Sequence, residues 1–553
     1  MQGNRKSNTL RTIVKRRRRN RWNKKGTVAV FLTMILAAVF GLTAVFFEGA
    51  CSAAARSISE GLLESAGRSA LSEYHKALQN RYGIFARESE PEDLKSDIQY
   101  YIEASLTDEP AHSGQTALAE QTADPAENRK KQQVFKPVSL SLLDLNADGA
   151  EYSLLIPEVL EKQILDFMKY KALSAGIDLH QREAALTGGI TELINAGRNT
   201  EKQKREAKEA EQKQAELDRK ARQEREENGE SGEDPEEARR KRKTKQLKNM
   251  VTNLKKRNEY TEATSEAGER VLRSEQEKQW LPSKLTGVSG FPDIGKFLAK
   301  KDANGNEDEN GNGAAHTGGI LTGVRNSIYL DEYILLQFKC HTSGTGFPEA
   351  ETFFENEVEY ILCGHDSDQA NLRQIKTYLF TIRTALNLAH VYSDEGKRNA
   401  TLEAAAAIAP GPGAPAVQFL IATLWAGLES EEDLRALLAG ERVPLIKSAD
   451  DWKTDLFSAG KAVSKTESEA AQGSGQTYED YLRFLLFMQN RECRLMRALD
   501  LIQLNIRLES DRSFLAERYC AGFTCIAEFG RRTGMRAPFS FAGGYQVEKI
   551  HLY

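Results

Sequence analysis

One stretch of the chain, Thr27–Phe47, runs for twenty-one residues without a charged side chain. At 1.5 Å per residue, a helix of this length spans roughly 30 Å, which is the thickness of the hydrocarbon core of a bilayer. Apolar runs in the buried helices of soluble domains are usually shorter. A second apolar run, Pro415–Leu428, is too short and contains Gln418, so we interpret it as a buried helix. The sequence therefore predicts one transmembrane helix, over residues 26–47.

The charge on either side of this segment indicates its orientation. Residues 1–25 contain eleven Lys or Arg and no Asp or Glu, whereas the rest of the chain carries a formal charge of −15. Trp22 precedes the apolar segment, where a tryptophan fits an interfacial anchor, and Glu48 follows the segment directly. Because positive charge stays on the cytoplasmic side, we expect a basic cytoplasmic tail over 1–25 and an extracellular bulk.

A cleaved signal peptide is the main alternative for this segment. Its apolar core exceeds the usual length, although Ala53, Ala54 and Ala55 offer small residues to a peptidase. Cys51 suggests a lipoprotein site, but Glu48 stands where such sites carry an aliphatic residue. We expect a retained, single-pass anchor in the cell membrane.

Small residues continue the helical period beyond the membrane. The stripe recurs every four residues, and the helix that carries it is expected to end near Tyr82-Gly83. Its members are Ala54, Ile58, Leu62, Ala66, Ala70 and Tyr74. We expect an external stalk helix region over 48–106, continuous with the membrane helix. The stripe could contact a second copy of the chain and make a homo-oligomer, or pack on the protein's own domain; both readings stay open.

Composition divides the middle of the chain. Residues 107–136 and 261–320 lack apolar periodicity and read as linkers and loops, while 137–185 reads as an α/β segment with one or two strands and a helix. Residues 186–260 read as a charged helical hairpin, because Glu201–Glu227 holds nine basic and nine acidic residues with almost nothing apolar. Its base would close through Leu186, Ile190, Leu193 and Ile194 against Leu247, Met250, Val251 and Leu254.

The last segment, 321–553, has the texture of a mostly helical C-terminal domain. Short strands are expected at Tyr329–Cys340 and Tyr545–Leu552. The fold class is therefore mainly α with minor β: a single N-terminal transmembrane helix, an external stalk, a charged helical hairpin insertion and a mostly helical C-terminal domain.

Candidate chemical sites are few. Asp144–Gly149 matches the first half of a calcium loop, but Leu155 occupies the position of the bidentate carboxylate, so a polar turn is favoured. The alternating oxygen ligands of 302–308 lack the central glycine and read as a flexible loop. The pairs at Cys340-His341 and Cys363–His365 match no common zinc spacing. We expect no catalytic, cofactor or metal site.

The six cysteines fit no dense disulfide framework, and only Cys520 and Cys525 are close enough in sequence to bridge if oxidised. The basic run Arg239–Lys248 has a composition that could bind nucleic acid. Because the topology places this run outside the cell, a solvated face or a contact with cell-wall polymers is favoured, and no nucleic-acid partner is expected.

Two groups of motifs resemble a known family. The first comprises Lys25-Gly26, the apolar helix, Glu48, Arg56 and the small-residue run Ser65–Ala70, which look like the N-terminus of TadE/TadG-like proteins of the Tad (Flp) pilus. The second resembles an uncharacterised family of Gram-positive Tad-locus proteins, and its segments are Tyr82–Phe85, Gln163–Tyr170, Glu357–Gly364, Trp425–Ser430 with Asp433, Val443–Leu445, Tyr481–Arg483 and Asp500–Asn505.

The resemblance implies a membrane-anchored structural component of pilus or secretion assembly, with other Tad membrane proteins as partners and no enzymatic activity. It also marks Gly26 and Thr27 as a candidate processing site. Pilins carry a Glu five residues after the processed glycine, but Phe31 stands there in this chain. Since Phe31 cannot offset a neighbour's buried N-terminal amine, we expect the chain to keep its tail and act as an anchored factor. The alternative is an anchored cell-wall-acting enzyme or a surface sensor.

Overall fold

The computed structural model describes residues 6–106, 139–174, 176, 178–228, 234–260, 271–272, 275–290, 317–343, 351–456, 475–531 and 536–545. Within these ranges the chain is mainly helical with a minor sheet, which confirms the expected fold class at that level. The chain divides into two compact units. Unit 1 comprises residues 1–73, 87–151 and 522–553, and unit 2 comprises 74–86 and 152–521. The predicted linker at 107–136 lies outside the described residues.

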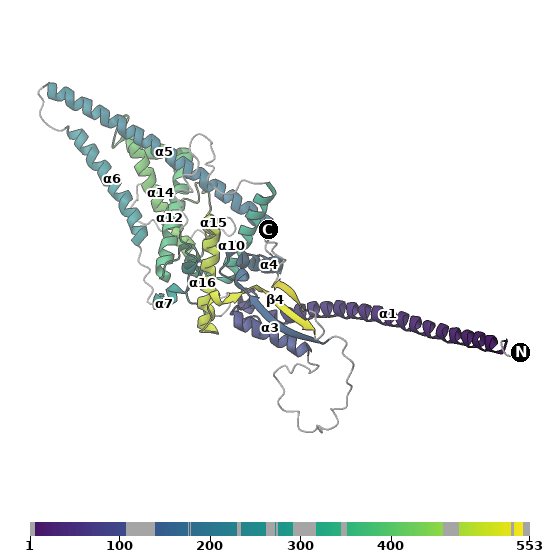
Figure 1. The fold of residues 1–553 in the computed structure, drawn as a ribbon. Helices are drawn as coiled ribbons and strands as arrows, with labels where there is room; N and C mark the ends of the chain where they lie inside the picture. Colours follow the sequence, from purple (N-terminus) through teal and green to yellow (C-terminus); the bar gives the residue numbers. More distant parts are fainter. Residues whose placement is uncertain are drawn as a thin grey trace, which may run out of the picture. The chain divides into compact units, whose positions relative to one another are not determined.

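A single long helix, α1 (Lys6–Leu71), begins unit 1. It runs without a break through the apolar segment and beyond it (Figure 1). It ends at Leu71, earlier than the end predicted near Gly83, because the backbone turns over residues 72–75 and a second helix, α2 (Lys76–Tyr82), begins there. The His75 imidazole caps α2 by accepting a hydrogen bond from the Leu78 amide, and Gly83 ends it with a φ of 70°.

The sheet of unit 1 joins two distant parts of the chain. Strand β4 (Gly522–Arg531) lies between β2 (Leu140–Asp148) and β5 (Arg536–Gly544), and both pairings are antiparallel. Alternate residues of β4 are apolar and buried, so one face of the sheet covers a core. The core residues come from α1, α3 (Pro91–Leu106) and the sheet: Leu63, Ala66, Ala70, Leu94, Ile98, Ile102, Leu145, Ala147, Phe523, Cys525, Ala527 and Phe529.

The face that α1 turns to this sheet agrees with the predicted stripe at Ala66 and Ala70, which are buried, and differs from it earlier in the helix. There Ala55, Ser59 and Leu63 are buried, whereas Ala54 is exposed and Ile58 keeps 46% of its surface exposed. Gly67 shows the physical reason, because a Cβ placed there would lie 2.6 Å from the ring of Phe541. The sheet needs a helix face with almost no side-chain bulk at this point. The external part of α1 therefore uses this neighbouring face to pack on the protein's own domain.

Two predictions about strands and turns change in unit 1, and a third lies almost wholly outside the described residues. Asp144 lies in strand β2 rather than in a polar turn, because β2 pairs with β4 from Leu140 to Asp148. The C-terminal strand is β5, whereas the predicted strand at Tyr545–Leu552 lies almost wholly outside the described residues. Strands β4 and β5 belong to unit 1 rather than to the predicted C-terminal domain at 321–553, since their partner is β2.

Unit 2 is built almost wholly from helices. Its longer described helices are α4 (Pro157–Ser174), α5 (Leu179–Glu227), α6 (Pro235–Tyr260), α10 (Thr317–Gln337), α12 (Asp368–Ser393), α13 (Glu395–Ala406), α14 (Ala414–Leu438), α15 (Tyr478–Met488) and α16 (Arg491–Glu509). Its short elements are α2, α7 (Glu275–Gln279), α8 (Pro282–Leu285), α11 (Glu357–Cys363) and the two-residue β3 (Tyr519–Cys520). Every residue of α16 from Cys493 to Ile506 is buried, so this helix forms the centre of the unit.

The segment predicted as a strand at Tyr329–Cys340 is mostly helix α10. Its residues are buried on nearly all sides, so the helical period that marks an amphipathic helix is hidden. Asp331 and Glu332 are buried there because Arg494 pairs with the first and Arg483 with the second, at 2.8 Å. Pairing with these two distant arginines therefore allows the acidic side chains of α10 to be buried.

Helices α5 and α6 carry the charged segment that was predicted to close on itself. At their bases, both helices pack against α12 and α14, which lie between them (Figure 1). Leu254 of α6 meets Gly427 of α14, where an added Cβ would lie 2.5 Å from the leucine. Met250, predicted to be part of the apolar closure, keeps 45% of its surface exposed. The two arms therefore bury their apolar residues on the helical body.

Candidate functional site

The first candidate site is the apolar part of α1. Its large side chains from Val28 to Phe47 expose between 46% and 70% of their surface, and this helix is long and apolar enough to cross a membrane. Two threonine hydroxyls within its described side chains donate to carbonyls three residues earlier, Thr33 to Val30 at 2.8 Å and Thr43 to Phe40 at 3.0 Å. These two hydroxyls therefore need no water as a partner, which a hydrocarbon environment requires.

The candidate processing residues Gly26 and Thr27 lie within the helical backbone of α1, and their side chains fall outside the described part of the structure. A helix that continues upstream to Lys6 gives this position no turn or extended segment. The processing hypothesis stays a prediction.

Polar contacts begin directly after the apolar segment. Arg531, the last residue of β4, donates to the carboxylate of Glu48 at 2.8 Å, and the arginine side chain exposes only 6% of its surface. Cys51 is the first buried residue of α1 after this pair. The sheet of unit 1 therefore covers α1 from one turn beyond the apolar segment. The folded part of unit 1 therefore follows the candidate membrane helix directly, without an intervening linker.

Unit 2 holds two buried glutamates on the short helix α11. Glu357 accepts from the amide of Lys339 and Glu359 from the amide of His341, both at 2.9 Å. Burial raises the pKa of each carboxyl to about 7, and hydrogen bonds, from Asn505 to Glu357 and from Tyr478 to Glu359, oppose that rise in part. These two carboxyl groups accept the amide hydrogen bonds of the segment that follows α10. Their role is therefore to fix the backbone of that segment.

The cysteine and histidine pairs suggested by the sequence lie in the same region. Burial raises the pKa of Cys340 to about 11 and raises that of Cys363 as well, so both stay as thiols at neutral pH. The pKa values of His341 and His365 are lowered, chiefly by burial. Among the described residues, no three His, Cys, Asp or Glu side chains gather as metal ligands. A buried, protonated thiol is a poor nucleophile and a poor metal ligand.

A buried ion network joins α12, α14 and the segment after α14. Asp433 accepts from Arg383 at 2.8 Å and pairs with Lys447 at 2.6 Å; Lys447 also contacts Glu429. These side chains expose no more than 2% of their surface. Burial by itself would raise the pKa of Asp433, but Arg383 and Lys447 outweigh it and lower the pKa.

The same network fixes the segment 444–454 to the helices. Arg383 donates to the carbonyls of Pro444 and Leu445, at 2.9 and 3.1 Å, while Glu429 accepts from the amides of Lys453 and Thr454. In the sequence, Asp433 stood out only as part of the resemblance to the Tad-locus family. The available signal was the acidic run at 429–433 inside a helix that is otherwise apolar.

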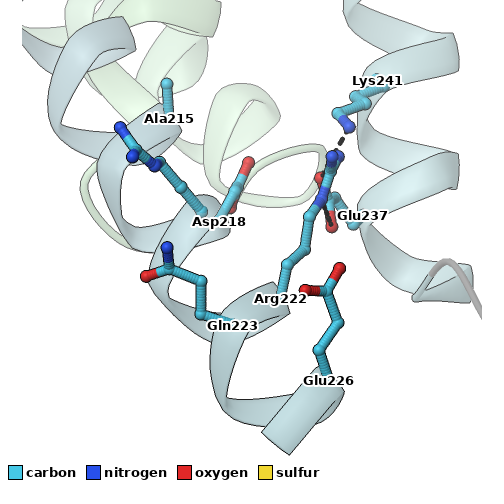
Figure 2. Close-up of a pocket in the computed structure, with 8 residues that line it drawn as sticks. Ala215, Asp218, Arg222, Gln223, Glu226, Glu237 and Lys241 are labelled. Atoms are coloured by element: carbon cyan, nitrogen blue, oxygen red, sulfur yellow. Dashed lines mark hydrogen bonds and ion pairs between the residues drawn. The ribbon is translucent and has the colours of Figure 1, made fainter. Parts of the chain in front are cut away.

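Charged residues form the second candidate surface, on α5 and α6 (Figure 2). Figure 2 shows Arg222 of α5 reaching Glu237 of α6, with Lys241 beside the same carboxylate. Hydrogen bonds from Arg222 and Lys241 lower the pKa of Glu237 to about 2. Asp218 of α5 pairs with Arg240 of α6 at 2.5 Å. The ends of the two helices are therefore joined by ion pairs between long side chains rather than by an apolar interface.

These features define a mainly helical protein with one N-terminal helix that could cross a membrane. A model of a family of unknown function, DUF5702, matches residues 225–530, which is more than half of the chain. The chain belongs to this family. No curated protein and no solved structure matches it.

Proposed function

We propose that this protein is a single-pass, membrane-anchored structural component of a pilus or secretion assembly of the Tad type. Its N-terminal tail would lie in the cytoplasm and its two units outside. The observation that carries the proposal is the exposed apolar surface of α1 between the basic residues 1–25 and Glu48, where the first contact of α1 with the sheet is made through Arg531. The resemblance of residues 25–70 to TadE/TadG-like proteins supports the pilus assignment.

A structural rather than enzymatic role is supported by how unit 2 uses its reactive groups. The buried glutamates of α11 hold backbone amides, and the thiols of Cys340 and Cys363 are buried and protonated. Asp433 and its partners fix a loop. Each of these groups therefore has a role in the fold of the unit. Partners on this proposal are the membrane and other assembly proteins, with a second copy through the exposed face of α1 as a further candidate.

The orientation is tested with protease added outside intact protoplasts. We expect loss of the external parts of units 1 and 2 and survival of a small fragment that contains Thr27–Phe47, because the membrane would protect that segment and the cytoplasmic tail before it. Lysed protoplasts provide the control in which the basic tail is also digested. Protection of residues 60–553 in intact protoplasts would contradict the orientation.

The pilus role is tested by the N-terminus of the protein extracted from membranes. We expect the chain to keep residues 1–25 and to stay with the membrane after filaments are sheared from the cells, because Phe31 cannot offset the charge of a new N-terminus at Thr27. A Phe31→Glu variant is the matched comparison, and we expect it to enter filaments more readily. A wild-type chain that begins at Thr27 and is recovered in sheared filaments would replace the anchored factor with a minor pilin.

A further inference from the structure

The two charged arms differ in their balance of charge. Helix α5 contains eleven basic and eleven acidic residues, so it is formally neutral. Helix α6 contains ten basic and three acidic residues. The surplus positive charge of this region therefore lies on α6.

Part of that surplus is neutralised by contacts within the protein. Arg240, Lys241 and Lys248 pair with the carboxylates of Asp218, Glu237 and Glu211, at distances of 2.5 to 2.7 Å. Arg257 pairs with Glu431 of α14. Arg240 and Lys248 pair with α5 and Arg257 with α14, so these three cations fix the helix in place, whereas Lys241 pairs with Glu237 of α6 itself.

The remaining cations of α6 have no carboxylate within ion-pair distance among the described residues: Arg239, Arg242, Lys243, Lys245, Lys255 and Lys256. Arg239, Arg242 and Lys245 are exposed. Their spacing of three residues places them in a row that covers about 9 Å along the helix axis. Like charges this close repel one another, so the row is the part of α6 that an external anion would stabilise.

We propose that the outer face of α6 formed by Arg239, Arg242 and Lys245 binds a linear phosphodiester polymer. A single exposed ion pair contributes little, so several contacts to one chain are needed. Arginine suits phosphate because its guanidinium donates two parallel hydrogen bonds. Before Tyr260 the helix carries no aromatic side chain on which a nucleobase could stack. The row therefore recognises the charged phosphodiester backbone of a polymer rather than nucleobases.

The source of such a polymer follows from the proposed function. On the topology proposed above, α6 lies outside the membrane, where phosphodiester polymers of the cell wall are the matching chemistry. Only this identification of the source rests on the proposed function. The binding itself does not, so it can be measured on purified protein whatever the topology.

The test measures binding of the full chain in detergent to fluorescent poly(glycerol phosphate) at several salt concentrations. We expect wild-type binding that weakens as salt rises, because the contacts are ionic. The triple variant R239Q/R242Q/K245Q should lose at least tenfold in affinity. The matched control K202Q/K208Q/K213Q removes the same charge from exposed positions of α5, where acids are interspersed, and should stay within twofold of wild type.

Several outcomes would overturn the proposal. Equal losses in the two triple variants would mean that net charge, and not the α6 row, drives binding. Equal affinity for poly(glutamate) would remove the phosphodiester assignment, and tenfold tighter binding of single-stranded DNA would favour a nucleic-acid surface. Absence of wild-type binding at low salt would leave the row as a solvated face. Circular dichroism of both variants checks that each still folds.

Discussion

Replacing Asp433 by Asn removes the carboxylate that pairs with both Arg383 and Lys447. The side chain keeps its size, so the change acts on the charge and not on packing. Lys447 would keep its contact with Glu429, whereas Arg383 has no other carboxylate within ion-pair distance among the described residues, in a network that exposes almost no surface. Breaking a buried ion pair from one side costs about 3–5 kcal/mol, because a charge is left without its partner.

The assay is urea unfolding of the full chain in detergent, followed by tryptophan fluorescence. Trp452 reports locally, because its ring lies 5.6 Å from the Lys447 ammonium and 5.4 Å from the ring of Trp425. With an m-value of about 3 kcal/mol per molar urea, the midpoint should fall by about 1–1.7 M.

The neighbouring residue supplies the control for this experiment. Glu432→Gln removes the same charge from the same helix, but Glu432 pairs with Arg435 at an exposed position. Exposed pairs contribute about 0–1 kcal/mol, so the midpoint should barely move. If Asp433→Asn also unfolds within 1 kcal/mol of wild type, the network does not hold the loop and the reasoning fails.

Three further predictions follow from the structure. Because burial raises the pKa of Glu357 and Glu359 to about 7, the folded state keeps their protons to a higher pH than the unfolded state. The stability of the fold should therefore fall as pH rises from about 4.5 to about 7. Melting temperatures measured by calorimetry at about pH 5.5 and about pH 8 test this. Glu359→Gln should flatten that dependence and raise the melting temperature at pH 8 relative to wild type, whereas an unchanged pH profile would show that Glu359 is ionised in the fold. Gly67→Leu should destabilise unit 1 by about 1–3 kcal/mol, since its Cβ would lie 2.6 Å from the Phe541 ring; hydrogen exchange of β5 measures the effect, and Gly61→Leu, at a position with open space, is the matched control.

Features that depend on composition alone could be predicted from the sequence. Twenty-one uncharged residues fix the length and surface of the apolar part of α1 whatever surrounds it. A strand within residues 137–185 was likewise expected and is β2, and the apolar run Pro415–Leu428, expected as a buried helix, lies in α14. These are local properties, in which neighbours in sequence decide the backbone.

Features that depend on distant partners could not be predicted. Strand β2 pairs with β4, nearly four hundred residues away, and no local pattern names that partner. The face that α1 buries is chosen by the ring of Phe541 against Gly67, and a stripe of small residues on a helix fits two adjacent faces equally well. Helix α10 was mistaken for a strand because Arg494 and Arg483 allow its acidic residues to be buried.

The candidate sites divide in the same way. The sequence by itself determined that a basic segment precedes an apolar helix and that one arm of the charged region is more basic than the other, because charge and hydropathy are sums over residues. Only the tertiary structure decided which cations of α6 are paired and which are left over, and that Asp433 lies among buried cations. The energy of an ionic group depends on its burial and its partners, and both are set by residues that the fold brings together from far along the chain.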